Sequence, residues 1–269
     1  ESLADYLPGE PSMLLNPLPN LYFTRDLAAV IGQGLALCSM NNLARRREAT
    51  LMRLIAFNHP DFADAQVLYN NALYQMPLEG GDILVLSARA IAVGCSQRTN
   101  VHAVDYLARR LFSADSSYQS VLAIHIPASR AFMHLDTVMT MVDRDSFVVY
   151  PHVAEQMEAV EISRGSGDKL RYQRHDNIRA ALKTVLELDD VRLILSGGGD
   201  ARVAAREQWN DAANTLCVAP GRVIVYNRND ITNRCLRQNG IEIIEIEGSE
   251  LVRGRGGPRC MSMPLLRLP

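Results

Sequence analysis

The stretch DILVLSARAIAVGCSQRTNVHAVDYLARRLF, residues 82–112, decides the fold class together with VLAIHIP, residues 121–127. Its first half contains two short apolar runs on either side of a polar turn, which predicts a β-hairpin. The second half predicts an amphipathic helix, and the apolar run at 121–127 predicts a third strand. The predicted apolar face of the helix consists of Val101, Val104, Ala108 and Leu111. The order strand, strand, helix, strand indicates an α/β protein built from ββαβ units.

The same order recurs in the segments 27–69, 138–195 and 215–246. The third copy has a hairpin that turns at residues 143–145 and an Asp/Asn-capped helix at 176–188. In the fourth copy we predict a hairpin turn at Pro220-Gly221 and a short helix that Gly240 closes. Four copies predict a repeat fold in which equivalent loops point toward a shared axis.

Composition limits the function classes. The 269 residues are nearly half hydrophobic and carry a formal charge of −2, so neither nucleic acid nor an anionic membrane is an expected partner. No apolar run reaches the ~18 residues of a membrane span, and the acidic N-terminal segment does not resemble a signal peptide. We expect a cytoplasmic protein with a single domain over residues 1–269.

The loops that enter the hairpins carry polar residues that strands do not need. In chain order these are Asp26, then Glu79 and Asp82, then His134 and Asp136, then Asn210 and Asp211; Cys260 follows the last strand. A second set of equivalent positions, just after three of the hairpins, holds Arg45, Arg98 and Arg228. We therefore expect acids, a histidine, arginines and a cysteine to meet near the shared axis.

Cys260 has three candidate roles: a disulfide partner, a buried core thiol or a nucleophile. The five cysteines form no CxxC pair and no metal-ligand spacing, which disfavours a disulfide framework and a zinc site. Because Arg255 and Arg259 flank Cys260, we expect its thiolate to be favoured. The other four, Cys38, Cys95, Cys217 and Cys235, are predicted to be small buried hydrophobes.

Five motifs together resemble the arginine deiminases, guanidine-modifying enzymes of the pentein superfamily. They are LPNLYFTRD (18–26), LEGGDILVL (78–86), MHLDTVMTMVD (133–143), REQWNDAANTL (206–216) and RGRGGPRCMSMPL (253–265). The resemblance runs in order over nearly the whole chain. It implies a five-bladed α/β propeller of ββαβ modules, four of which are recognisable here, without the usual N-terminal module and helical insertion.

The resemblance also implies a role for each site residue. Cys260 would be the nucleophile, Glu79 and His134 would transfer protons, and Asp26 and Asp136 would grip the substrate guanidinium. The α-carboxylate end would be bound by Asn20, Arg45, Arg98 and Arg255, with Asp82 as a further substrate-binding residue. Two carboxylates suit a guanidinium because it is planar, permanently charged and rich in N–H donors.

The implied reaction converts L-arginine into L-citrulline and ammonia through a covalent thiouronium-type intermediate on Cys260. This route calls for no metal and no organic cofactor. The resemblance leaves open whether the chain forms a homo-oligomer. Amidinotransferases, agmatine deiminases and methylarginine hydrolases share the same cysteine, histidine and acids, although the three arginines favour a substrate with a carboxylate. A shortened chain with a non-catalytic binding or subunit role is the other alternative, and a zinc hydrolase is a more distant one.

Overall fold

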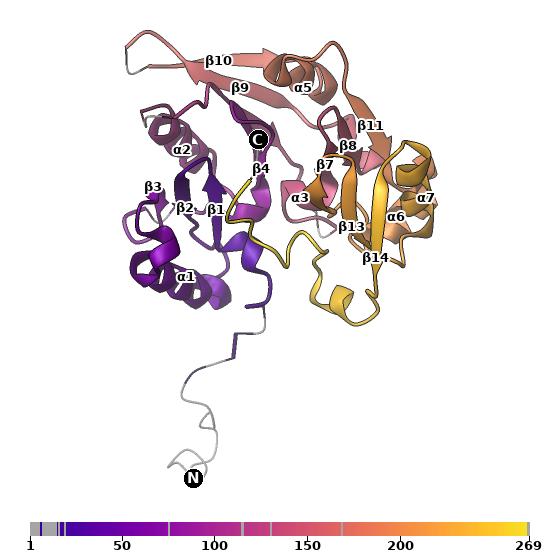
Figure 1. Cartoon of the computed structure of the whole chain (residues 1–269), viewed down its shortest axis with the longest axis horizontal. Helices are drawn as coiled ribbons and strands as arrows, with labels where there is room; N and C mark the ends of the chain where they lie inside the picture. Colours follow the sequence, from indigo (N-terminus) through magenta and orange to yellow (C-terminus); the bar gives the residue numbers. More distant parts are fainter. Residues whose placement is uncertain are drawn as a thin grey trace.

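The computed structural model describes residues 6, 15, 17–18, 20–74, 76–113, 116–129, 131–167 and 169–267. It confirms the four predicted ββαβ modules, which follow one another along an arc with their long helices on the outside (Figure 1). In every module an antiparallel hairpin is followed by a helix and by a strand parallel to the second hairpin strand.

The first module contains β1 (Ala28–Ile31), β2 (Gly34–Leu37), α1 (Arg46–Asn58) and β3 (Gln66–Asn70), and the second β4 (Ile83–Val85), β5 (Ala90–Cys95), α2 (Val101–Ser113) and β6 (Ser120–His125). The third contains β7 (Met139–Asp143), β8 (Ser146–Val149), α5 (Ile178–Leu186) and β11 (Arg192–Leu195), and the fourth β12 (Leu216–Ala219), β13 (Arg222–Tyr226), α7 (Asp230–Gln238) and β14 (Glu242–Ile246). Three shorter helices connect these elements: α3 (Leu135–Val138), α4 (Pro151–Ala154) and α6 (Ala201–Gln208).

Sequence periodicity missed one hairpin. Strands β9 (Ala159–Arg164) and β10 (Leu170–His175) lie between α4 and α5 and extend the second sheet to five strands, in the order β10-β9-β6-β5-β4. Most of β10 is exposed, so it lacks the apolar alternation that marks a half-buried strand. The turn at Pro220-Gly221 is confirmed, with Gly221 in the left-handed region at φ 72°.

The core lies between the sheets and the helices that cover them. Strand β5 is buried from Ala90 to Val93, and α2 packs Val104, Ala108 and Leu111 against its sheet as predicted. Val101 departs from the prediction, because it is the first residue of α2 and 55% exposed. Among the cysteines expected in the core, Cys38 is buried and Cys95 and Cys235 are half-buried, whereas Cys217 is exposed on the edge strand β12.

Short 3-10 helices and α3 lead into the hairpins and converge at the middle of the arc. Helix η2 (Thr24–Asp26) precedes β1, η5 (Gly80–Asp82) precedes β4, and α3 precedes β7. The segment after η7 (Leu251–Gly254) returns to this point, where the Arg25 N–H donates to the Cys260 carbonyl at 3.1 Å. None of the helices in these described ranges has the length and apolarity to cross a bilayer.

Candidate active site

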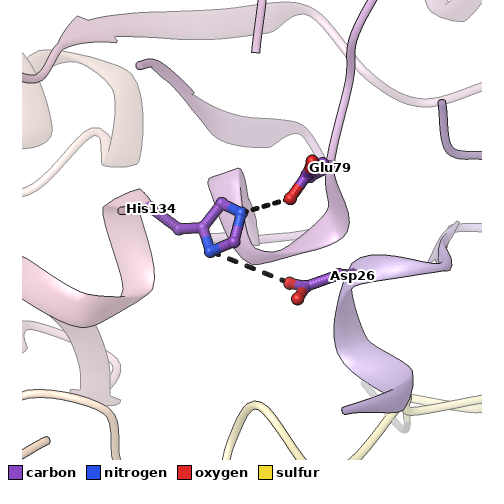
Figure 2. Close-up of side chains that lie close together, drawn as sticks. All are labelled: Asp26, Glu79 and His134. Carbon is purple, nitrogen blue, oxygen red and sulfur yellow. Dashed lines mark hydrogen bonds and ion pairs between the residues drawn. The ribbon is translucent and has the colours of Figure 1, made fainter. Parts of the chain in front are cut away.

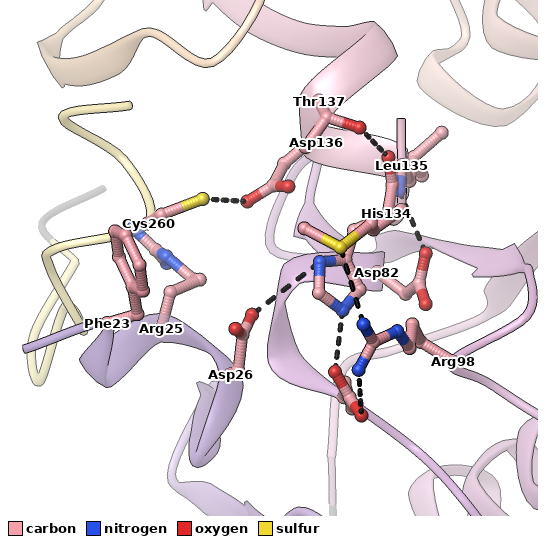
Figure 3. Close-up of polar contacts among 12 residues, drawn as sticks. Phe23, Arg25, Asp26, Asp82, Arg98, His134, Leu135, Asp136, Thr137 and Cys260 are labelled. Carbon is pink, nitrogen blue, oxygen red and sulfur yellow. Dashed lines mark hydrogen bonds and ion pairs between the residues drawn. The ribbon is translucent and has the colours of Figure 1, made fainter. Parts of the chain in front are cut away.

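The middle of the arc brings together the five residues expected to carry the chemistry. Asp26, Glu79, His134, Asp136 and Cys260 are all at least 95% buried. In Figure 3, the side chains of Cys260, Asp136, His134 and Asp26 point toward one another; His134 and Asp136 come from the start of α3, and Asp26 and Cys260 from two other segments. The sequence-based expectation that these loops meet is therefore confirmed.

Two glycines allow this convergence. A Cβ at Gly80 would lie 2.1 Å from the Arg25 carbonyl oxygen, so η2 and η5 can touch only if residue 80 has no side chain. A Cβ at Gly81 would lie 2.7 Å from Asp26 Oδ1 and 2.9 Å from the His134 ring. The two glycines of the LEGGD motif therefore leave space for the Arg25 backbone and for the side chains of Asp26 and His134.

His134 is held between two carboxylates (Figure 2). Its Nε2 lies 2.7 Å from Glu79 Oε2, and its Nδ1 lies 3.9 Å from Asp26 Oδ1. Burial alone would lower the pKa of His134, but the charge of Asp26 and the hydrogen bond to Glu79 outweigh it and raise the pKa to about 10. The ring is therefore an imidazolium at neutral pH and can serve as a proton donor.

The Cys260 thiol lies next to a carboxylate rather than next to a free cation. Its Sγ is 3.8 Å from Asp136 Oδ2. Burial, followed by the charges of Asp136 and Asp26, raises the pKa of Cys260 well above its ordinary value, and Arg259 lowers it by less. Arg259 thus favours the thiolate as expected, but burial and the neighbouring carboxylates outweigh it. Arg259 donates to Asp136 Oδ2 at 2.6 Å, and the Arg255 guanidinium lies 4.1 Å from the centre of the Trp209 ring.

Two buried carboxylate oxygens of these five residues have no hydrogen-bond partner in the part of the chain that the structure describes. They are Oδ1 of Asp26 and Oδ1 of Asp136, while the second oxygen of each residue accepts a bond from an arginine, Arg45 or Arg259. A buried carboxylate oxygen without a donor carries a large desolvation cost, which a cationic ligand with N–H groups would remove. The site is thus chemically suited to a small cation with several donors.

Comparisons with known proteins identify the family of the chain. The model of the arginine deiminase family matches residues 1–267. The chain belongs to the arginine deiminase family. It is 48% identical over 272 residues to the arginine deiminase of Bacillus cereus (strain B4264) and 46% identical over 273 residues to arginine deiminase 1 of Staphylococcus epidermidis, covering 99% and 98% of this chain. It spans 65% and 66% of the length of these two relatives.

Solved structures share the fold at much lower identity. AgrE in complex with ornithine and NAD+ superposes with a TM-score of 0.67 at 18% identity, over 95% of this chain and 31% of AgrE. A DDAH from Pseudomonas aeruginosa superposes with a TM-score of 0.61 at 16% identity, over 91% of this chain and 76% of that one. These similarities support the predicted α/β pentein-type fold.

Within this arginine deiminase-family chain, the arginines expected at the carboxylate end have different surroundings. Arg45 is buried and pairs with Asp26 at 2.5 Å and with Glu48 at 2.9 Å. Arg98 is half-buried, with its guanidinium 3.8 Å from Glu79 Oε1 and 3.3 Å from the sulfur of Met133. Arg45 thus stabilises the Asp26 carboxylate, in addition to the substrate contact predicted for it.

Asn20 and Asp82 occupy different depths. Asn20 is half-buried in the turn before η2, where its carbonyl accepts from the Phe23 N–H at 2.9 Å. Asp82 is fully buried and accepts from the Ser96 hydroxyl at 2.7 Å and from the Leu135 N–H at 2.8 Å, and burial raises its pKa to about 7. Asp82 Oδ1 therefore holds the chain next to His134, and Oδ2 holds the loop after β5, roles that loop composition alone did not suggest.

One group of side chains has the spacing of a cation site. Ligand atoms of Asp26, Glu79 and His134 lie within 4.8 Å of one another. A metal would need a neutral His134 ring, and the same two carboxylates keep that ring protonated. The geometry thus suits an imidazolium ion pair better than a metal centre.

Proposed function

We propose that this chain hydrolyses L-arginine to L-citrulline and ammonia with Cys260 as the nucleophile. The observation that carries the proposal is that the buried Oδ1 atoms of Asp26 and Asp136, beside the Cys260 thiol and the His134 imidazolium, accept no hydrogen bond from the described residues. A guanidinium supplies N–H donors for these two Oδ1 atoms, together with a positive charge. We place the substrate's planar group between them, within reach of Cys260 Sγ.

Substrate binding would also activate the nucleophile. In the free protein the carboxylates oppose ionisation of Cys260. A guanidinium brings a full positive charge to within a few ångströms of the sulfur, and at an effective dielectric of about 20 such a charge stabilises an anion by about 4 kcal/mol. The thiol therefore loses its proton to solvent when the substrate is present.

The chemistry then proceeds in two halves. The thiolate attacks the guanidinium carbon, and the His134 imidazolium protonates a terminal nitrogen, which leaves as ammonia when its C–N bond breaks. The product is an S-linked thiouronium on Cys260. Neutral His134, oriented by Glu79, then takes a proton from water as the hydroxide attacks the same carbon. The hydroxyl proton of the resulting adduct passes to solvent as the C–S bond breaks, which releases neutral citrulline and the thiolate.

Selectivity for a free amino acid is assigned to the arginine-rich end of the site. Arg98 and Arg255, with Asn20 and Arg45, are proposed to bind the α-carboxylate, because a carboxylate in a partly buried site needs cationic partners. Agmatine has no carboxylate and could not make these contacts. We therefore expect arginine to be preferred over agmatine.

The test measures citrulline formation by the 269-residue chain, with the Cys260→Ala variant and with Cys217→Ala as the matched control at an exposed cysteine. Agmatine, an Nω-methylated arginine, and arginine with glycine as amidine acceptor are the competing substrates. We expect citrulline from arginine in the parent and in Cys217→Ala, and none in Cys260→Ala. Absence of turnover in a parent with a cooperative unfolding transition would refute the proposal, as would full activity in Cys260→Ala.

A further inference from the structure

We propose that Asn214 is a positioning residue: its side-chain amide fixes the nucleophile Cys260 relative to the clamp residue Asp136. This assignment rests on the proposed function of those two residues. Asn214 lies in the loop between α6 and β12 and is fully buried. Its Nδ2 donates to the Asp136 carbonyl at 3.0 Å, and its Oδ1 accepts from the Cys260 N–H at 3.0 Å.

The amide connects segments that are far apart in the sequence. Asp136 is 78 residues before Asn214, and Cys260 is 46 residues after it. Cys260 reaches the site on a loop, so its position depends on contacts of this kind rather than on a strand or long helix. One planar group with a donor and an acceptor can satisfy both backbone groups and keep their separation constant.

Packing around Asn214 prevents the amide from moving. A Cβ at Gly257 would lie 2.7 Å from the Cβ, the carbonyl oxygen and Oδ1 of Asn214, so the RGGPRC loop lies directly against it. The Asn214 N–H also donates to the Asp211 carbonyl at 2.9 Å. Because the amide is held on both sides, its two hydrogen bonds transmit a defined geometry to the thiol.

A buried asparagine elsewhere in the fourth module provides a matched control. Asn233 is 1% exposed, and its Nδ2 donates to the Tyr226 carbonyl at 3.0 Å within that module. Asn214→Ala and Asn233→Ala each remove a buried amide that bonds a backbone carbonyl. If Asn214 has only a structural role, the two variants should lose similar amounts of stability and no more. If it is a positioning residue, Asn214→Ala alone should also change the reactivity of Cys260.

The test compares alkylation of Cys260 by 2-chloroacetamidine and by neutral 2-chloroacetamide, scored on the Cys260 peptide by mass spectrometry. In both reactions the thiolate displaces chloride and forms an S–C bond, but only the amidinium also binds the carboxylate clamp. The ratio of the two rates therefore reports how the thiol lies relative to Asp136. It does not require arginine turnover, so it distinguishes failure of this inference from failure of the proposed function.

We expect the rate ratio to fall at least tenfold in Asn214→Ala and to stay within twofold of the parent in Asn233→Ala. In the arginine assay, kcat should fall about 10- to 100-fold with KM changed less than threefold. If Asn214→Ala does not fold, Asn214→Asp, which keeps the acceptor for the Cys260 N–H but loses the donor, should lower the ratio at least threefold. An unchanged ratio in the folded variant, or an equal fall in Asn233→Ala, overturns the assignment.

Discussion

Replacing Asp136 by asparagine should make Cys260 more reactive toward a neutral alkylating reagent while it abolishes arginine turnover. The two effects have opposite signs because Asp136 has two proposed roles. It would grip the guanidinium through its unpartnered Oδ1, and its charge opposes ionisation of the thiol 3.8 Å away. A variant that only disrupted the site would lower both the reactivity of Cys260 and the turnover of arginine.

The magnitude follows from the sulfur–oxygen distance. Two unit charges 3.8 Å apart interact by about 4 kcal/mol at an effective dielectric of about 20, which corresponds to about a thousandfold in the thiolate population. Water that enters the altered site increases the local dielectric and reduces this effect. We therefore expect iodoacetamide to modify Cys260 between 10- and 1000-fold faster in Asp136→Asn at about pH 8.

The assay follows modification of the Cys260 peptide as a function of pH, with Asp190→Asn at an exposed carboxylate as control. A larger thiolate population moves the midpoint of the rate profile to lower pH, whereas better access of the reagent raises the plateau at high pH. An unchanged or higher midpoint in Asp136→Asn would refute the electrostatic reasoning. The control should leave the profile as in the parent.

Three further predictions concern the charged neighbours of the site. Arg45→Met removes the cation that is hydrogen-bonded to the buried Asp26 carboxylate and leaves His134 at 3.9 Å, so it should lower the free energy of unfolding in urea by about 3–5 kcal/mol; a loss below about 1 kcal/mol would contradict this. Because the Trp209 ring holds the Arg255 guanidinium, Trp209→Ala should raise KM for arginine about two- to fivefold with kcat unchanged, and a lower kcat at constant KM would argue against it. The raised pKa of His134 contributes stability fully below about pH 6.5 and loses it as the pH rises to about 10, so the melting temperature should fall across this range more steeply in the parent than in His134→Gln.

Much of the fold could be predicted because apolar periodicity reports burial directly. The hairpin at 82–96 has two continuous apolar runs and the helix at 101–112 has one apolar face, and both elements appear where expected. Strand β10 was missed because most of its residues are exposed on both faces. A strand whose side chains are exposed is held by backbone hydrogen bonds, and its sequence therefore lacks the apolar alternation that predicts a strand.

The convergence of the loops that carry the proposed site residues could also be predicted, because equivalent loops of a repeat point toward a shared axis. The electrostatics of the site could not be predicted from the sequence. Sequence proximity placed Arg259 beside Cys260, yet its guanidinium pairs with Asp136, 123 residues away. Likewise nothing in the local sequence indicates that Asn214 bonds both Asp136 and Cys260. Tertiary packing decides which partner a buried polar group has, and the spacing of residues in the local sequence does not report it.

The central claim, covalent catalysis by Cys260 on a clamped guanidinium, is tested most directly by the intact mass of the protein quenched in acid during turnover of L-arginine. We predict a transient species heavier than the free chain by arginine minus ammonia, with the added group on the Cys260 peptide and absent from Cys260→Ala. Citrulline formation without such a species under rapid quenching, or with the adduct on another residue, would contradict the account.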